Sequence, residues 1–240
     1  IISEEDIYAL NSKAIEEAYK HFIKENESDM KFYCVGSSVV RYYMNDYSIT
    51  NLESHKAKKI GVDMIATFLP DDVVDGLYKA VESAGLSVAS LTLEPIAAIE
   101  LAIPEKFRLL NIALVDVGAG TSDISITKEG TITAFGMIPV AGDSLTETIA
   151  QHCMVEFNVA EKIKREAGEK DVVTYEDILG LPQQISASEV EELLYPSVKK
   201  MTDDVAEKIL ELNGGKSVGA VFVVGGGGKI PGYTKALAER

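Results

Sequence analysis

One short run combines acidic, small and hydroxyl-bearing residues that could bind a metal ion and phosphate groups together. It reads Asp-Val-Gly-Ala-Gly-Thr-Ser-Asp over residues 116–123, and the apolar segment 112–117 that leads into it has the pattern of a buried strand. A carboxylate placed there loses hydration, and Mg²⁺ carrying its own water molecules would compensate for that loss. Asp116 is therefore the candidate catalytic acid and the candidate ligand of Mg²⁺, which it would bind through water.

The small residues of this run could bind an anion. Gly118 and Gly120 let the backbone approach a phosphate closely and turn its N–H groups inward. Thr121 and Ser122 add hydroxyl donors. An ordinary hairpin turn with a buried aspartate would produce the same pattern, and the run alone leaves this alternative open.

A second run, near the end of the chain, consists of four glycines and a lysine. It follows the apolar segment 218–224, and Ile230 and Pro231 come directly after it. Ordering four glycines costs considerable chain entropy, which usually means that a ligand or another backbone passes close by. A flat heterocycle lying across the turn would explain this run, whereas its tight flanks argue against a flexible loop. The candidate nucleotide-binding residues here are Gly225, Gly226, Gly227, Gly228 and Lys229.

Two other nucleotide-binding motifs do not fit this chain. The sequence has no GxxxxGK[ST] run, which excludes a P-loop at the level of motifs. Gly118 and Gly120 lack the third glycine of the dinucleotide fingerprint, because Asp123 occupies that place and a strand follows instead of a helix.

Together and in this order, the two runs resemble the superfamily of actin, sugar kinases, DnaK-type heat-shock chaperones and bacterial cytoskeletal proteins. Its members bind ATP between two ribonuclease-H-like lobes. The resemblance implies an α/β fold with ATP and Mg²⁺ as cofactors. It places residues 116–122 at the β- and γ-phosphates and the metal, and residues 225–229 at the adenosine.

Two further segments match the superfamily pattern. Glu94 corresponds to the glutamate of the connecting helix, which helps to position the metal or the attacking water, and we count it with the catalytic residues. Gly142 and Asp143 stand at the Gly-Gly-Asp turn of the family, where Ala141 replaces the first glycine. The resemblance therefore implies that both residues bind the nucleotide.

A glutamate and a lysine three positions apart complete the candidate site. Glu161 and Lys164 correspond to the helical pair that reaches the ribose and adenine in the superfamily. Their spacing places both on one face of a helix. Without the resemblance, such a pair more often forms a solvated ion pair.

Within the superfamily, the chain most resembles the FtsA family of bacterial cell-division proteins, actin-like adaptors that link the division ring to the membrane. The order of elements expected for residues 1–105 carries this resemblance, because it is that of subdomain 1C of FtsA, a small α+β module followed by the connecting helix of the first lobe. Residues 106–240 then form the second actin-like, nucleotide-binding lobe. The pilus-assembly protein PilM shares the 1C module and remains a close rival.

Hydrophobic periodicity predicts the elements of both parts. Cys34 and Cys153 lie in an apolar run and on a helical pattern, so we expect both to be core thiols. For the first part the predicted elements are a helix after the capping box Ser3–Asp6, strands 31–36 and 39–44, a polar loop 45–59, a strand 61–69, a helix 71–84, a strand 86–93 and a helix 94–103. For the second part they are a meander of strands 112–117, 124–127 and 131–135, helices 144–156 and 160–167, a loop with a short helical piece over 168–182, a helix 188–212 that Pro196 should kink or split, a strand 218–224 and a helix opened by Pro231.

Composition narrows the partners. A net charge of −15, from 38 acidic and 23 basic residues, repels phosphate backbones, so we expect no nucleic acid partner. No apolar run has the length of a membrane span and no signal peptide is recognisable, so we expect a cytoplasmic location. Contact with the inner face of the membrane would use segments outside this chain. The sequence has no initiator methionine and lacks the first phosphate loop of the superfamily, so we expect a piece of a longer protein.

The favoured function is an ATP-binding, actin-like cytoskeletal adaptor in cell division, with protein partners or self-association and at most slow Mg-dependent ATP hydrolysis. A PilM-like pilus scaffold and a chaperone-like reactivating factor remain alternatives. A sugar or acid kinase is less favoured because it needs a catalytic base beside an acceptor pocket, and Glu94 and Asp116 are better used on metal and water.

Overall fold

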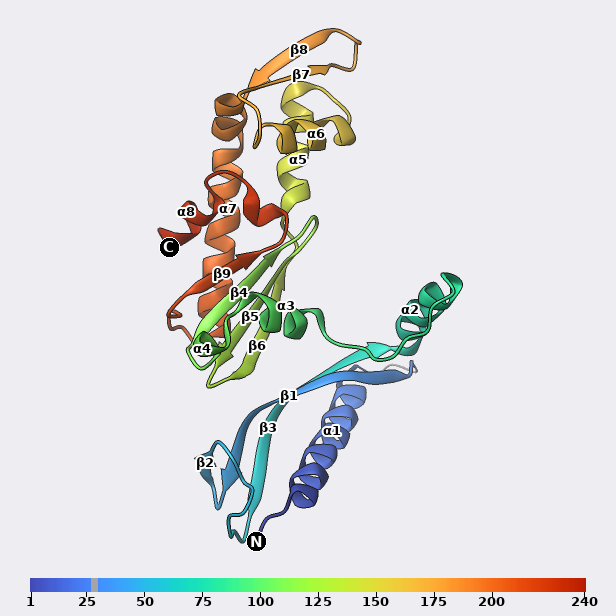
Figure 1. Ribbon diagram of the computed structural model, residues 1–240, viewed down its shortest axis with the longest axis vertical. Helices are drawn as coiled ribbons and strands as arrows, with labels where there is room; N and C mark the ends of the chain where they lie inside the picture. Colours follow the sequence, from blue (N-terminus) through green and yellow to red (C-terminus); the bar gives the residue numbers. More distant parts are fainter. Residues whose placement is uncertain (27–29) are drawn as a thin grey trace. The chain divides into compact units, whose positions relative to one another are not determined.

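The structure, a computed structural model, describes residues 1–26 and 30–240, which form two compact units (Figure 1). The first unit comprises residues 1–101 with 130–133, and the second comprises residues 102–129 with 134–240. The boundary predicted between residues 105 and 106 lies close to the main division after Leu101. Each unit has its own sheet and is described separately.

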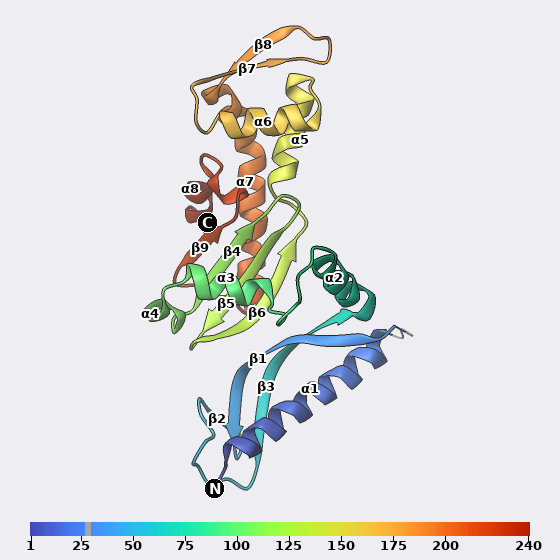
Figure 2. The same cartoon turned by 45° about the vertical axis from the view of Figure 1, so that its right-hand side comes forward.

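A three-stranded antiparallel sheet and a long helix form most of the first unit. The strand order is β2–β1–β3. Helix α1 lies along one face of this sheet (Figure 2), where Tyr19 and Phe22 pack on the ring of Phe68 with centroid distances of 5.6 and 5.3 Å. The elements are α1 (Glu4–Asn26), β1 (Phe32–Met44), β2 (Tyr47–Ile49), β3 (Ile60–Pro70), α2 (Asp71–Ser83) and α3 (Glu94–Ala102).

Several predictions for the first unit are wrong. Residues 32–44 form one strand instead of two, and β-bulges absorb the change of register between Cys34 and Gly36 and between Val39 and Arg41. Gly36 lies within the strand, and its lack of a side chain makes room for Leu93, because a Cβ there would lie 2.7 Å from Cδ1 of Leu93. Cys34 is exposed and is not a core thiol. The predicted polar loop contains β2, and residues 86–93 are irregular instead of forming a strand.

The second unit is built around a four-stranded sheet with the order β6–β5–β4–β9. The predicted meander is confirmed, and β9 adds to it in parallel with β4. This pairing brings the ends of β4 and β9 together, although the two strands are far apart in the sequence. The elements are α4 (Glu105–Arg108), β4 (Ile112–Val117), β5 (Ser122–Lys128), β6 (Thr131–Ile138), α5 (Gly142–Cys153), α6 (Phe157–Glu166), β7 (Val172–Glu176), β8 (Pro182–Ser186), α7 (Ala187–Leu212), β9 (Val221–Val224), the 3₁₀ turn η1 (Gly227–Lys229) and α8 (Tyr233–Ala238).

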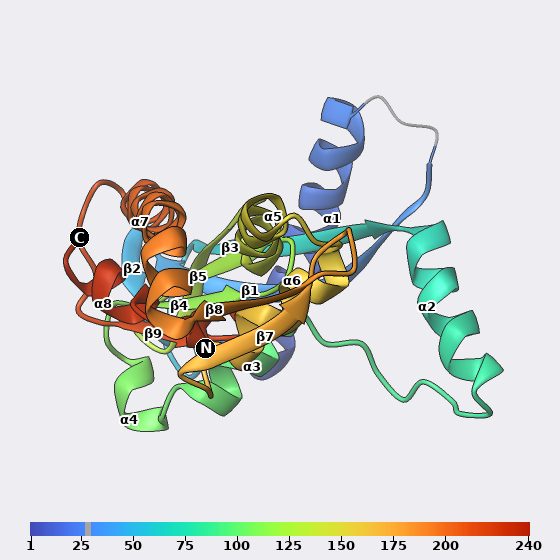
Figure 3. The same ribbon diagram turned by 90° about the horizontal axis from the view of Figure 1, so that it is seen from above.

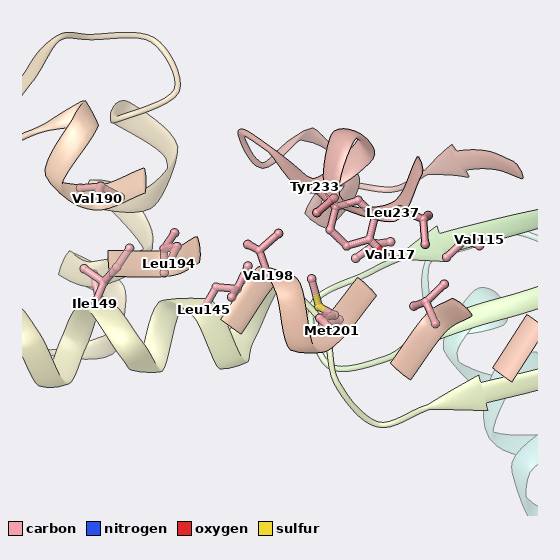
Figure 4. Packing of buried hydrophobic residues seen from close by; sticks show 14 of the residues in the cluster. Val115, Val117, Leu145, Ile149, Val190, Leu194, Val198, Met201, Tyr233 and Leu237 are labelled. Carbon is pink, nitrogen blue, oxygen red and sulfur yellow. The ribbon is translucent and has the colours of Figure 1, made fainter. Parts of the chain in front are cut away.

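One continuous core joins the helices of the second unit to its sheet. Helices α5 and α7 lie side by side, as the view along their axes shows (Figure 3). Figure 4 shows side chains of α5 and α7 meeting one another, and further along α7 those of β4 and α8. Cys153 is buried in this core, which confirms the prediction for that thiol. The labelled members are Val115, Val117, Leu145, Ile149, Val190, Leu194, Val198, Met201, Tyr233 and Leu237.

Two local predictions for the second unit are wrong. Residues 168–182, expected to be a loop, contain β7, which pairs with β8 in an antiparallel hairpin. Pro196 does not split α7, which is a single helix of 26 residues that contains it. Pro196 lies on the exposed side of α7, where water can hydrogen-bond the carbonyl that the missing N–H leaves free. Among the described residues, no helix is both long and apolar enough to cross a membrane.

Helix α7 begins with a complete capping box, which gives a test of its contribution. Ser186 Oγ accepts a hydrogen bond from the Glu189 N–H at 3.2 Å, and the Glu189 carboxylate accepts one from the Ser186 N–H at 2.8 Å. We expect Ser186→Ala to lower the free energy of unfolding by about 1 kcal/mol, because an N–H of the first turn loses its acceptor. Urea unfolding measures the change. The control Ser217→Ala alters an exposed serine outside the helices and should change the midpoint little; equal effects of the two substitutions would contradict the assignment.

Candidate functional site

A cavity of about 630 Å³ lies within the second unit, where most of the predicted site residues converge. This volume is within the range of small-molecule and cofactor sites. The lining residues predicted from the sequence are Gly118, Gly142, Asp143, Glu161, Lys164, Gly226, Gly227 and Lys229. Other lining residues, including Ala119, Arg165, Val190, Glu191 and Leu194, were not predicted to take part.

The first glycine-rich run forms the turn between β4 and β5. The Gly118 N–H donates to the Thr121 carbonyl at 3.0 Å and closes the turn. Ser122 is completely buried and its hydroxyl donates to the Val140 carbonyl at 2.8 Å, so it faces the protein interior instead of a phosphate. The exposed Thr121 donates its hydroxyl to Asp123 at 3.1 Å. Gly118 thus lines the cavity, whereas both hydroxyls bond to groups of the protein itself.

The beginning of α5 is hydrogen-bonded to this turn. The N–H groups of Gly142 and Asp143 donate to the carbonyls of Gly118 and Ala119 at 3.1 and 2.8 Å. A Cβ on Gly142 would lie 3.2 Å from the Gly118 oxygen, which explains the glycine. Ala141 precedes it with a φ of −160°, an extended conformation open to any residue, so the alanine in place of the family glycine causes no strain.

Asp116 lies at the end of β4, directly opposite Asp123 on β5. Partial burial and the charge of Asp123 raise the pKa of the Asp116 carboxyl. A cation near the two carboxylates would offset both effects. Mg²⁺ suits this donor set because it needs one or two carboxylates and takes its remaining ligands from phosphates and water. Among the described residues, no group of three or more acidic, histidine or cysteine side chains could form a complete metal site from the protein alone.

The second glycine-rich run packs against the first. Gly225 has a φ of +85°, and a Cβ there would collide with the Val117 carbonyl and lie 2.5 Å from Oδ1 of Asp116. Cβ atoms on Gly227 and Gly228 would each lie 2.5 Å from a valine methyl group. Gly226 alone of these four has open space around its Cβ position. The glycines therefore let the turn after β9 pass close to β4, and Gly226 and Gly227 line the cavity.

Glu161 and Lys164 form a partly buried ion pair on α6, with Oε2 and Nζ 2.6 Å apart. Lys164 also donates to the Gly142 carbonyl at 2.9 Å and to Oγ1 of Thr146 at 2.6 Å. Thr146 is completely buried on α5, and its role was not predicted. Its position one helical turn after Gly142 is the signal that could have indicated it. Burial opposes the charged form of Glu161, but the hydrogen bonds from Lys164 and Thr146 outweigh it and lower the carboxyl pKa.

The other predicted residues lie elsewhere or support the cavity indirectly. Glu94 is the first residue of α3, in the first unit, and is exposed, so its role toward metal or water stays a prediction. Gly120, Gly225 and Gly228 belong to the two turns without lining the cavity. Asp116 lies beside Gly225 and is not among the residues that line the cavity.

A family model described as cell division protein FtsA matches residues 113–240 of the chain. The chain belongs to the FtsA family. The FtsA of Bacillus subtilis (strain 168) is 24% identical over 169 residues, which cover 67% of this chain and 38% of that protein. The chain thus spans about two fifths of this FtsA, and residues 1–112 lie outside the family-model match.

Solved structures show the same fold. A chain of the PilM–PilN type IV pilus biogenesis complex superimposes with a TM-score of 0.67 at 17% identity, covering 99% of this FtsA-family chain and 62% of that chain. MreB5 of Spiroplasma citri, solved bound to AMPPNP, superimposes with a TM-score of 0.55 at 23% identity, covering 69% and 56% of the two chains. The α/β fold predicted from the sequence is therefore confirmed as that of the actin-like ATPases.

The Gly225 turn gives a matched test of the packing between the two runs. We expect Gly225→Ala to lower the free energy of unfolding by roughly 2–5 kcal/mol, combining about 1–2 for left-handed backbone with 1–3 for overpacking. Gly226→Ala, with φ −67° and open space, should change it by less than about 1 kcal/mol. Chemical denaturation compares the two variants. Equal losses would show that the close approach to β4 does not depend on Gly225.

The charge of Glu161 predicts a pH dependence. Because its folded pKa is lowered from an ordinary value of 4.5, the ionised carboxylate stabilises the folded state above that pH, and this contribution is lost as pH falls through the folded pKa. Wild type should therefore be more stable than Glu161→Gln at pH 6, and the difference should shrink below pH about 4.5. Urea midpoints across this range measure it. Glu147→Gln, which removes an exposed charge on α5, is the control; a difference that grows toward low pH would contradict the assignment.

Proposed function

We propose that this FtsA-family chain binds ATP with Mg²⁺ in the cavity of the second unit, and that the bound nucleotide controls assembly with protein partners in cell division. The observation that carries the proposal is the convergence of both glycine-rich runs with Glu161 and Lys164 on one cavity. The ancestry is consistent with this, because MreB5, a protein of the same fold, was solved bound to AMPPNP.

The cavity offers different chemistry at its different walls. At the β4–β5 turn, Gly118 and Ala119 present backbone to the phosphates, while Gly142 and Asp143 begin α5, whose N-terminal end favours negative charge. Their own N–H groups are already bonded to the turn, so the field of the helix contributes more than direct donation does. Gly226, Gly227 and Lys229 also line the cavity, beside this turn, and the adenosine would lie against them.

Mg²⁺ would supply charge neutralisation between the phosphates and the carboxylates. Asp116 would hold it, through water, with Asp123 beside it. Asp116 is partly buried beside the Gly225 turn, and Asp116 and Asp123 are only two carboxylates, which favours a site that binds a hydrated cation together with phosphate over one that binds the ion alone. We propose at most slow hydrolysis, with Glu94 helping to position the attacking water.

The small sheet of the first unit supports an adaptor over a reactivating factor. A reactivating factor of the chaperone type would be expected to carry a helix-rich insertion, whereas the first unit has the sheet β2–β1–β3 with α1 on it. A pilus scaffold is the second candidate, because the PilM-containing structure covers both units of this chain. The match to the FtsA family model favours cell division. We place the protein in the cytoplasm, with any contact to the inner membrane face made through other segments.

Calorimetry with ATP tests the nucleotide proposal. In the wild type we expect Mg²⁺ to tighten ATP binding roughly tenfold or more over the same titration in EDTA, equivalent to about 1.4 kcal/mol. Asp116→Asn should bring this ratio close to one, because the hydrated ion loses its charged partner. Asp171→Asn, which removes an exposed carboxylate outside the cavity, should leave the ratio unchanged.

The outcomes separate nucleotide binding from the metal assignment. ATP binding with the same Mg²⁺ dependence in wild type and Asp116→Asn would contradict the role of Asp116 alone. No measurable heat with ATP in either titration would contradict the nucleotide proposal. Sedimentation with and without ATP then tests whether the nucleotide changes self-association.

A further inference from the structure

Gly36, at the first β-bulge of β1, lies directly against the side chain of Leu93. The three heavy atoms nearest to a Cβ on Gly36 would all belong to Leu93, with Cδ1 and Cγ only 2.7 and 2.8 Å away. Gly36 does not have a positive φ, so left-handed backbone does not explain the glycine. The glycine is explained instead by the space that it leaves for Leu93.

Leu93 covers the face of the sheet that α1 leaves open. Phe68 packs on α1, so the preceding residue of β3, Thr67, points to the opposite face. Gly36 pairs with Thr67 and shares that face with it. Residues 87–92, which precede Leu93, make no backbone hydrogen bond within the part of the chain that the structure describes. The side chain of Leu93 thus connects the end of this irregular segment directly to the sheet.

Leu93 also holds the first turn of α3. Its carbonyl accepts hydrogen bonds from the N–H groups of Ile96 and Ala97 at 3.0 and 3.2 Å, as expected of the residue on which a helix begins. Glu94 follows Leu93 directly and is the first residue of the helix. Because the side chain of Leu93 packs on the sheet and its carbonyl bonds to the helix, the sheet determines where α3 begins.

The side chain of Glu94 has no contact of its own that could hold it in place. It is exposed, and it takes part in no hydrogen bond or ion pair with the residues that the structure describes. The place of its carboxylate is therefore set by the backbone at the start of α3. For a group that orients a reacting molecule, a misplacement of about 1 Å can cost on the order of 100-fold in rate.

We propose that Gly36 and Leu93 are positioning residues that hold Glu94 where it orients water for ATP hydrolysis. This inference rests on the proposed slow hydrolysis with Glu94 at the water. In that reaction the water oxygen bonds to the γ-phosphorus while the bond from this phosphorus to the bridging oxygen of ADP breaks, and ADP, inorganic phosphate and a proton are released. Glu94 accepts a hydrogen bond from the water, so the rate depends on where the sheet places the start of α3.

Steady-state hydrolysis of Mg-ATP by the full chain tests the effect on the reaction. We expect Gly36→Ala to lower kcat roughly tenfold or more, because the added methyl group displaces Leu93. KM should stay nearly unchanged, because neither residue lines the cavity. In a Glu94→Gln background, Gly36→Ala should change kcat by less than about twofold, since the group that it misplaces is already lost.

Gly61→Ala is the matched control. It adds a methyl group to the same sheet, where the nearest atom is Cβ of Tyr43 at an ordinary contact distance of 3.6 Å, so it should leave kcat at the wild-type level.

Amide hydrogen exchange measures the connection between sheet and helix without any turnover. Gly36→Ala should raise the exchange rates of the Ile96 and Ala97 amides several-fold, whereas Gly61→Ala should not. Leu93→Ala should raise them as well. Adding Gly36→Ala to Leu93→Ala should then have little further effect, because the clash requires the leucine side chain.

The results distinguish this inference from the proposal beneath it. Unchanged exchange at Ile96 and Ala97 in Gly36→Ala would overturn it, and so would a loss of kcat that persists in full in the Glu94→Gln background. Turnover that needs Glu94 but tolerates Gly36→Ala would overturn the positioning role alone. A wild type that binds ATP without turnover would contradict the role of Glu94, and the positioning role with it, while leaving the nucleotide site standing.

Discussion

The close approach of the glycine turn after β9 to the end of β4 is the constraint on which the second unit depends. Strand β9 pairs in parallel with β4, and Asp116 stands beside Val224 at the end of the pairing. The next residue, Gly225, lies against the Val117 carbonyl and the Asp116 carboxylate, where there is no room for a side chain. Without this approach, the two glycine-rich turns would not lie together at the carboxyl ends of β4 and β9.

Hydrogen bonds connect the rest of the cavity to these turns. The first N–H groups of α5 donate to carbonyls of the β4–β5 turn, and Lys164 on α6 donates to a carbonyl at the start of α5. Helix α7 packs against α5 and supplies the apolar lining through Val190 and Leu194 (Figure 4). The cavity is therefore lined by glycine-rich turns, the first residues of a helix and a partly buried ion pair.

The sequence predicted features that depend on residue type, such as the glycine-rich turns, but it did not predict features that depend on contacts between distant segments. The second glycine run indicated a close approach because a Cβ on Gly225, Gly227 or Gly228 would collide with neighbouring atoms, and Gly225 also has a positive φ. The hairpin β7–β8 was missed because its strands are short and most of their residues are exposed. Residues 32–44 were divided in two because small residues usually end strands, and the packing of Leu93 against Gly36 could not be read from the sequence. Thr146 has no motif of its own, and its role depends on which side chains α6 brings to it.

The glycines after β9 also bear on how sequence signatures are interpreted across such proteins. Three of the four are required by neighbouring atoms of the chain itself, namely the Val117 carbonyl and the methyl groups of Val117 and Val223. A descendant that no longer bound nucleotide would still need them in order to fold. The glycine signature is therefore a marker of ancestry. Loss of nucleotide binding would first become visible at side chains that line the cavity but do not contribute to folding.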